Sequence, residues 1–155
     1  MMMDDILKKI GDRFGDKVLK VERKSSRRAY IDIHPRDTVD VVRYMFKDLA
    51  LRFNIASAVD DFDKIEILYH FAHDPSGAVV SIRTCLSDKD NPRIDTVTHV
   101  MKAAWWIERE MHELYGINFE GNSDMRRLLL PDDWPENVYP MRKSFVVPKR
   151  DSRSS

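Results

Sequence analysis

Residues 105–130 of this chain read WWIEREMHELYGINFEGNSDMRRLLL. Apolar residues in the first half of this stretch, and just before it, recur at steps of three and four, which is typical of one buried face of a helix. Asp95 or Thr96 could cap the start of the helix, and Gly116 stands where a left-handed C-terminal cap is wanted. The pattern predicts a helix from about residue 97 to residue 115, followed by a stop and a return segment.

Glu108 lies on the apolar face of this predicted helix. Burying an unpaired carboxylate is costly, so Glu108 needs a partner. The nearest cations in sequence are Arg126 and Arg127, just after the turn-like run Gly121–Asp124. We therefore expect the arginines of the return segment to pair with the acids of the helix.

Many of the same residues carry a resemblance to a known family. The chain resembles the 30 kDa subunit of respiratory complex I, which is also known as the C subunit of NADH–quinone oxidoreductase. This family includes the equivalent subunits of energy-converting membrane-bound hydrogenases, formate hydrogenlyase and F420H2 dehydrogenase. One departure is that the family usually has a histidine followed by a proline at the positions of Asn122 and Ser123. The resemblance covers the last third of the chain and rests on these residues: Glu108-Arg109-Glu110, Glu113-Leu114-Tyr115-Gly116, Phe119, Gly121, Arg126–Trp134 and Pro140–Lys143.

The resemblance implies a function for the chain. Such subunits carry no flavin, iron–sulfur cluster or quinone of their own, and partner subunits hold the iron–sulfur clusters, the NiFe centre or the flavin. The family's C-terminal segment lies against a large hydrogenase-like subunit, of the 49 kDa type, which carries the quinone site in complex I. We therefore expect a non-catalytic assembly subunit in the peripheral arm of a membrane-bound, ion-translocating oxidoreductase. The expected location is the cytoplasmic side of the membrane, with the large subunit and small iron–sulfur subunits as partners.

Composition sets limits on other functions. The 155 residues carry 26 basic and 26 acidic side chains, so the net charge is zero and no overall basic field for nucleic acid exists. The single cysteine, Cys85, excludes an internal disulfide and an all-cysteine cluster built within this chain. No run of about 18 apolar residues is present, so membrane attachment is expected only through other subunits.

The order of apolar patterns predicts the fold class. Helix signals precede two strands, a second helix precedes three strands, and the helix described above follows. This order describes an α+β domain with a small antiparallel or mixed sheet and helices packed on one side. The expected helices cover residues 4–14, 37–51 and 97–115, and the expected strands cover residues 18–23, 28–33, 53–59, 65–72 and 78–86.

After Gly116 the chain changes character. Prolines forbid long regular structure there, yet large apolar residues persist, which is unlike a disordered tail. We divide the chain into an α+β domain, residues 1–116, and an extended proline-rich segment that binds partners, residues 117–155. We predict no catalytic, cofactor-binding or metal-binding residues. The residues predicted to bind partners or to support that role are Glu108, Arg109, Glu110, Glu113, Arg126, Arg127, Trp134, Tyr139, Arg142, Lys143 and Phe145.

Two alternative functions compete with this one. A small free-standing enzyme would use Glu108, His112 and Glu113 in a cleft, although a zinc-protease helix would need a second histidine at position 116. An RNA-binding module would use the basic residues of the hairpin between residues 18 and 33, although such charge runs are usually solvated faces. Neither alternative has a complete motif.

Overall fold

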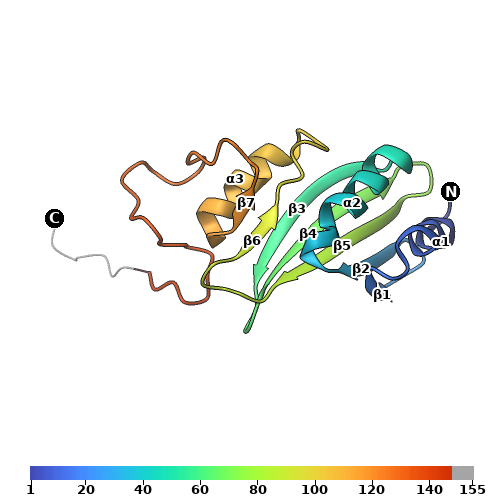
Figure 1. Cartoon of the computed structure of the whole chain (residues 1–155), viewed down its shortest axis with the longest axis horizontal. Coiled ribbons are helices and arrows are strands. Elements are labelled where there is room, and N and C mark those ends of the chain that lie inside the picture. Colours follow the sequence, from blue (N-terminus) through green and yellow to red (C-terminus); the bar gives the residue numbers. More distant parts are fainter. Residues whose placement is uncertain (148–155) are drawn as a thin grey trace, which may run out of the picture.

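The computed structural model describes residues 1–147, so residues 148–155 of the predicted partner-binding segment lie outside the described residues. Its main feature is a five-stranded mixed sheet with the strand order β1-β2-β5-β4-β3 (Figure 1). Strands β2 and β5 pair in parallel, and the other neighbours pair antiparallel. The strands are β1 (Val18–Arg23), β2 (Arg28–Ile33), β3 (Arg52–Asp60), β4 (Ile65–His73) and β5 (Ala78–Leu86).

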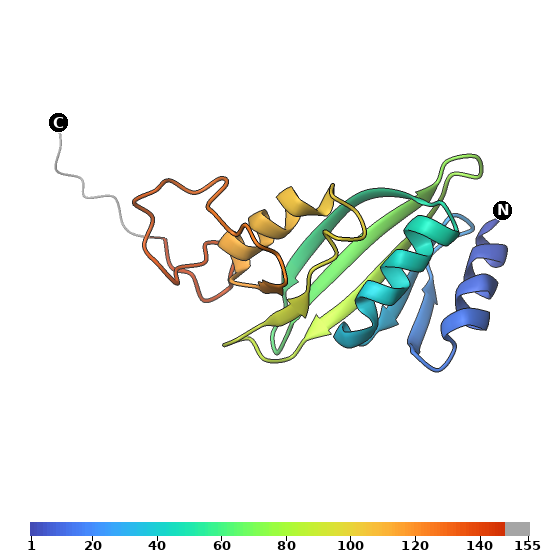
Figure 2. The ribbon, with the colours of Figure 1, turned by 45° about the horizontal axis from the view of Figure 1, so that its top comes forward.

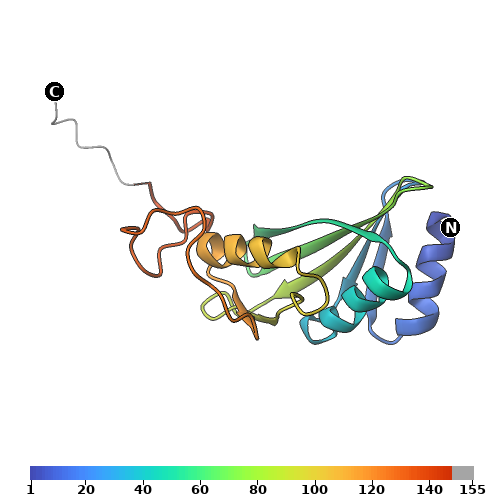
Figure 3. The same ribbon diagram turned by 90° about the horizontal axis from the view of Figure 1, so that it is seen from above.

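Alternation along the strands gives the sheet one buried face. In β4, the side chains of Ile65, Ile67, Tyr69 and Phe71 are fully buried, whereas those between them are half-buried on the other face. Three helices cover the buried face, as Figures 2 and 3 show: α1 (Met3–Phe14), α2 (Thr38–Arg43) and α3 (Ala104–Tyr115). The predicted α+β class, with helices on one side of a mixed sheet, is confirmed.

The second predicted helix is present but irregular. A 3-10 turn (Pro35–Asp37) leads into α2, and a π-helical turn (Tyr44–Asp48) continues it. The apolar period survives these changes, because Val41 and Met45 are both fully buried. The ring of Tyr44 meets that of Phe14 edge-on at 5.4 Å, which joins this helix to α1.

The third helix begins later than predicted. It starts at Ala104, whereas residues 96–103 form turns in which Val97 O accepts the N–H groups of Val100 and Met101. Val97, Val100 and Met101 are buried in these turns, so their spacing imitated a longer helix. Neither Asp95 nor Thr96 caps α3, because Asp95 ends a short strand and Thr96 binds Glu108 instead.

A two-stranded parallel sheet links the body to the chain after α3. Its strands are β6 (Arg93–Asp95) and β7 (Asn118–Glu120). Ile117 is fully buried and Phe119 is 1% exposed, so both belong to the core rather than to an extended segment. The division predicted at residue 116 therefore lies between α3 and β7, and irregular structure begins at Gly121. Within residues 1–147, no helix has the length and apolar character needed to cross a bilayer.

Candidate interaction surface

The C-terminal end of α3 is shaped to receive the segment that follows it. Gly116 ends the helix at φ 74°, the left-handed conformation predicted for it. The ring of Tyr139 covers this glycine so closely that a Cβ at position 116 would lie 2.5 Å from two ring carbons. Glycine is therefore required twice here, for its backbone conformation and for the close approach of Tyr139.

Glu108 is buried as predicted, with 1% of its surface exposed, but its partners are different. Its carboxylate accepts hydrogen bonds from Thr96 Oγ1 at 2.6 Å, Val97 N at 2.8 Å and Asn122 Nδ2 at 2.9 Å. The predicted pairing with Arg126 or Arg127 is wrong. Neutral donors surround Glu108, and burial raises the pKa of its carboxyl group although these hydrogen bonds act to lower it.

Asn122 makes a contact that the sequence did not assign. Its side chain bridges the turn after β7 to Glu108, and its Oδ1 also accepts the N–H of Asp124 at 3.1 Å. The side-chain amide of Asn122 therefore supplies a hydrogen-bond donor at this position. The family usually has a histidine here, and the ring N–H of a histidine is also a donor. At this position of departure from the family pattern, the chain forms a hydrogen bond to Glu108.

The return segment is held by the charged side chains of α3, which bind its backbone rather than its side chains. Arg109 donates from Nε to Arg126 O at 2.9 Å and from Nη2 to Arg127 O at 2.8 Å. Glu113 accepts the three N–H groups of residues 128–130, at 2.9, 2.6 and 3.3 Å. These bonds satisfy backbone groups that no helix or sheet pairs. The predicted contact of helix and return segment is present, with this different chemistry.

The arginines of the return segment face other groups. Arg126 is exposed and donates from Nε and Nη2 to Asp124 at 2.7 and 2.6 Å. Arg127 donates from Nη1 to Pro131 O at 2.6 Å and from Nη2 to Trp134 O, which folds the following turn around its guanidinium.

The segment returns to the body a second time through Arg142 and Lys143. Arg142 donates to Tyr115 O at 2.6 Å and to Lys89 O at 2.8 Å, and the backbone N–H of Lys143 donates to Asp60 Oδ2 at 2.7 Å. The sequence prediction gave Arg142 and Lys143 ionic contacts to a partner. In the structure, the Arg142 side chain and the Lys143 backbone fasten the segment to its own domain, and the Lys143 ammonium lies 3.8 Å from Asp61 at the β3–β4 turn.

The three predicted aromatic contact residues are half-buried against one another and against the helix end. Trp134 donates from Nε1 to Val138 O at 2.8 Å, and its ring lies 6.0 Å from that of Phe145. Tyr139 covers Gly116. Glu110 lies on the exposed side of α3, and no described hydrogen bond involves its side chain.

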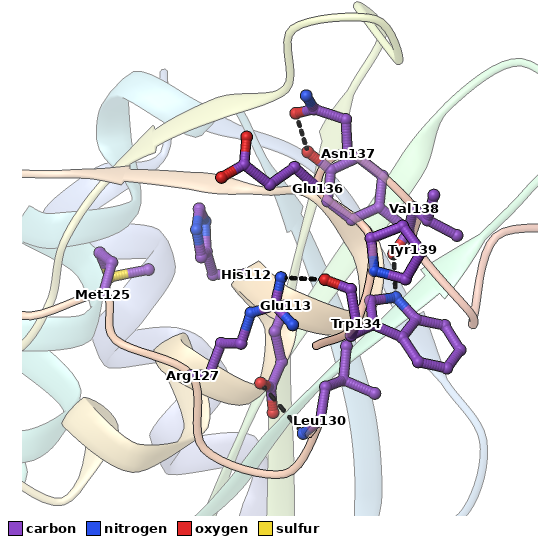
Figure 4. Close-up of a pocket in the computed structure, with 11 residues that line it drawn as sticks. His112, Glu113, Met125, Arg127, Leu130, Trp134, Glu136, Asn137, Val138 and Tyr139 are labelled. Carbon is purple, nitrogen blue, oxygen red and sulfur yellow. Dashed lines mark hydrogen bonds between the residues drawn. The ribbon is translucent and has the colours of Figure 1, made fainter. Parts of the chain in front are cut away.

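A cavity of about 300 Å³ opens between the end of α3 and the loop that follows residue 130 (Figure 4). His112 and Glu113 line it from the helix, and Arg127, Trp134 and Tyr139 line it from the loop. His112 Nδ1 donates to Ile117 O at 2.8 Å, so this nitrogen carries a proton. Glu113 is occupied by backbone N–H groups, and Glu108 is not part of the lining, so the trio of the enzyme alternative does not share a cleft.

Beside this cavity lies a second, largely apolar hollow of about 440 Å³, lined by residues that include Val138, Tyr139, Phe145 and Val146. Several large apolar side chains of the segment remain in solvent, although the sequence did not single them out as contact residues. The exposed fractions are Leu129 61%, Met141 53%, Val146 82% and Val147 75%.

Other candidate sites stay separate. Within residues 1–147, no three His, Cys, Asp or Glu side chains are placed to hold a metal ion. Cys85 is half-buried on the sheet, and burial raises the pKa of its thiol. In the basic hairpin, Arg23 pairs with Asp4 and Lys24 pairs with Glu22, so part of its charge is neutralised internally.

Comparisons with known proteins agree with the resemblance in the last third of the chain and extend it. The family model described as respiratory-chain NADH dehydrogenase, 30 kDa subunit, matches residues 31–151. The C subunit of the NADH-quinone oxidoreductase of Chloroherpeton thalassium is 32% identical over 144 residues, which are 89% of this chain and 58% of that protein. Membrane-bound hydrogenase subunit beta of Pyrococcus furiosus is 30% identical over 143 residues, which are 88% of this chain and 82% of that protein.

A solved structure shows the same fold. One chain of the membrane-bound sulfane sulfur reductase, an archaeal respiratory membrane complex, superposes with a TM-score of 0.79 at 28% identity, over 92% of this chain and 85% of that one. This chain spans 58% of the length of the Chloroherpeton protein and 60% of the length of the corresponding proteins of two Salinispora species. Because the family model covers most of the sequence, the chain belongs to the family of the respiratory-chain NADH dehydrogenase 30 kDa subunit.

Proposed function

We propose that this chain is a non-catalytic assembly subunit of a membrane-bound, ion-translocating oxidoreductase related to respiratory complex I. The complex is of the NADH–quinone oxidoreductase type or of the energy-converting NiFe-hydrogenase type. In this proposal, the chain lies in the peripheral arm on the cytoplasmic side and binds the large hydrogenase-like subunit and small iron–sulfur subunits. Membership of the 30 kDa subunit family supports this role.

The observation that carries the proposal is the way the C-terminal segment is held. Its backbone is bonded to the body at residues 126–130 and again at residues 141–143. Its apolar side chains are nevertheless left in solvent, with Val146 82% and Leu129 61% exposed. A segment that is fixed in shape and apolar on its outer side is pre-organised to bury that side against another protein, because little ordering entropy remains to be lost.

The proposed binding is tested with serine substitutions that leave the body intact. Leu129→Ser, Val146→Ser and Val147→Ser in one chain remove exposed apolar groups that contribute little to the isolated fold. We expect an unchanged melting temperature of the isolated chain and a loss of about tenfold or more in the large subunit that co-purifies with it.

Leu19→Ser is the matched control, since Leu19 is 55% exposed on β1, at the opposite end of the molecule (Figure 1). Wild-type recovery of the large subunit by the triple variant would refute binding through the C-terminal segment. Loss of that subunit in the Leu19 control would show that any exposed apolar residue matters, which also contradicts the proposal.

We further propose that electron transfer occurs in the partner subunits and that this chain holds no flavin, iron–sulfur cluster or NiFe centre. Support comes from its single cysteine, since such clusters are held mainly by several thiolates. Iron and acid-labile sulfide analysis of the purified chain, with its visible absorption spectrum, tests this. Stoichiometric iron or a flavin spectrum would contradict it.

A further inference from the structure

A hollow of about 560 Å³ lies on the outer side of the junction between α3 and the return segment. It is lined by Arg109, Arg126, Arg127 and Asp132. Three arginines and one aspartate therefore border this open surface. The lining of the hollow carries more basic than acidic side chains, although the whole chain is neutral.

The charges of Arg109 and Arg127 lack a close counter-ion. Arg109 is 8% exposed, and its described hydrogen bonds go only to the carbonyl oxygens of residues 126 and 127. Arg127 likewise donates to carbonyl oxygens. Within residues 1–147, no carboxylate lies within 4 Å of either guanidinium. A buried charge without a close opposite charge is costly, and binding a carboxylate from outside would remove that cost.

The surroundings favour a protein carboxylate. The Arg109 guanidinium lies 5.1 Å from the ring centre of Trp105 and 6.0 Å from that of Trp106, and Trp106 is 58% exposed. A surface that combines exposed tryptophan with arginine has the composition of a binding hot spot. Asp132 in the lining would repel a doubly charged phosphate more than a singly charged carboxylate.

We propose that this hollow receives an aspartate or glutamate side chain from an acidic segment of the neighbouring subunit. This inference rests on the proposed function, because it names the chemistry of the partner at the same junction. The carboxylate accepts N–H bonds from the remaining donors of Arg109 and Arg127. Arg126 stands at the rim, where it already pairs with Asp124.

Arg126→Glu tests the proposal in the assembled complex. Arg126 is exposed and its side chain binds only Asp124, so the fold of the chain should survive the change. A new carboxylate at the rim should repel the incoming one. We expect about a tenfold or greater fall in co-purified large subunit at physiological ionic strength. Arg27→Glu, on the distant β1–β2 turn, is the control and should leave assembly unchanged.

Arg126→Lys identifies the partner group. A lysine at position 126 should couple to a carboxylate of the neighbouring subunit when the intact complex is treated with a carbodiimide, and mass spectrometry of the cross-link between subunits then names the acidic residue. Coupling to Asp124 of the same chain is not counted, because Arg126 already pairs with it. No coupling from position 126 to another subunit, together with normal assembly of Arg126→Glu, overturns the proposal. Binding of the isolated chain to phosphatidylglycerol vesicles that Arg126→Glu abolishes would also overturn it, because the hollow would then serve a lipid phosphate.

The outcomes separate this proposal from the proposed function. If the Leu129, Val146 and Val147 serine variant loses the large subunit and Arg126→Glu retains it, only the acidic contact is refuted. If both variants assemble normally, binding through the C-terminal segment fails as well.

Discussion

The body and the C-terminal segment of this protein are held together by different forces. In the body, β-ladders pair the backbone, and a continuous apolar core fills the space between sheet and helices. In residues 121–147, no helix or strand is present, and charged side chains of the body satisfy part of the backbone: Arg109 and Glu113 bind it directly, and Asp60 accepts one of its N–H groups. Arg142 of the segment binds carbonyl groups of the body in return. A segment without regular structure can therefore keep one shape when charged groups take over the role of a ladder.

This difference explains why the segment can present apolar residues. A sheet or helix is stable only when one of its faces buries apolar side chains against another element. Here the charged side chains fix the backbone, so Val146 and Leu129 need not be buried within the chain to keep its shape. The following changes test this contrast between the two regions, from the largest expected effect to the smallest.

Glu113→Ala should have the largest effect. It removes the acceptor of three backbone N–H groups at residues 128–130 and leaves them unpaired. We expect a loss of about 3 kcal/mol in the free energy of unfolding, since a hydrogen bond to a charged group contributes about 1.5–3 kcal/mol. Urea unfolding measures the loss, and amide exchange should be accelerated at residues 128–130.

Glu110→Ala is the matched control, because Glu110 is exposed on the same helix and makes no described hydrogen bond. Equal losses for the two variants would mean that removing any carboxylate from α3, rather than the bonds to the return segment, sets the effect.

Asp60→Asn should release the far end of the segment. Burial alone would raise the pKa of the Asp60 carboxyl, but the Lys89 ammonium at 2.6 Å and the Lys143 N–H lower it below its usual range. We expect a loss of about 2 kcal/mol in the free energy of unfolding at neutral pH, because the variant leaves the Lys89 ammonium without its close carboxylate. Limited proteolysis after Lys143 should quicken in the variant.

The pH dependence of the Asp60 effect has a definite sign. A lowered folded pKa means that the stabilisation is present above the unfolded value of about 3.9 and is lost as the pH falls through the folded value. The stability gap between wild type and Asp60→Asn should close in acid, as urea midpoints across that range would measure. A gap that widens in acid would contradict the role given to Asp60.

Asn122→Ala should lower the free energy of unfolding by about 1 kcal/mol, because it removes one of three hydrogen-bond donors to the Glu108 carboxylate. Ser123→Ala, at the exposed neighbouring position, should change the melting temperature little. Asn122→His tests the residue usual in the family, and a ring N–H donor that reaches Glu108 should restore part of the loss. A neutral result for Asn122→Ala would mean that water replaces the amide at no cost.

The smallest expected effect is the pH dependence of the stability difference between wild type and Glu108→Gln. Because burial raises the pKa of Glu108, the folded chain binds more protons than the unfolded chain just above the usual glutamate pKa of about 4.3. The stability contributed by Glu108 is therefore full below that pKa and falls as the pH rises through the folded value. As the pH is lowered from neutral towards about 5, the free energy of unfolding of the wild type should rise relative to that of Glu108→Gln. Paired urea titrations would measure this difference.

The strands were the most predictable part of the fold. Alternation in Ile65–Leu68 and the turn at Pro75–Gly77 mark β4 and β5 by short-range pattern alone, and the observed bounds differ from the predicted ones by at most one residue at either end. The start of α3 was mispredicted because buried residues in turns imitated a helix period, and β6 and β7 escaped notice because three residues give too little pattern.

The amino-acid sequence by itself determined the fold class, the stop at Gly116 and the burial of Glu108, because these depend on local period, backbone freedom and apolar neighbours. Only the tertiary structure decided which groups meet Glu108, Arg109 and Glu113. Charged side chains can bind either opposite charges or backbone groups, and the choice depends on which unpaired N–H and C=O groups the folded chain brings within about 3 Å. The expected ion pairs between α3 and the return segment are therefore absent from the described part of the chain, and Arg109 and Glu113 of α3 instead form hydrogen bonds to the irregular backbone of residues 126–130.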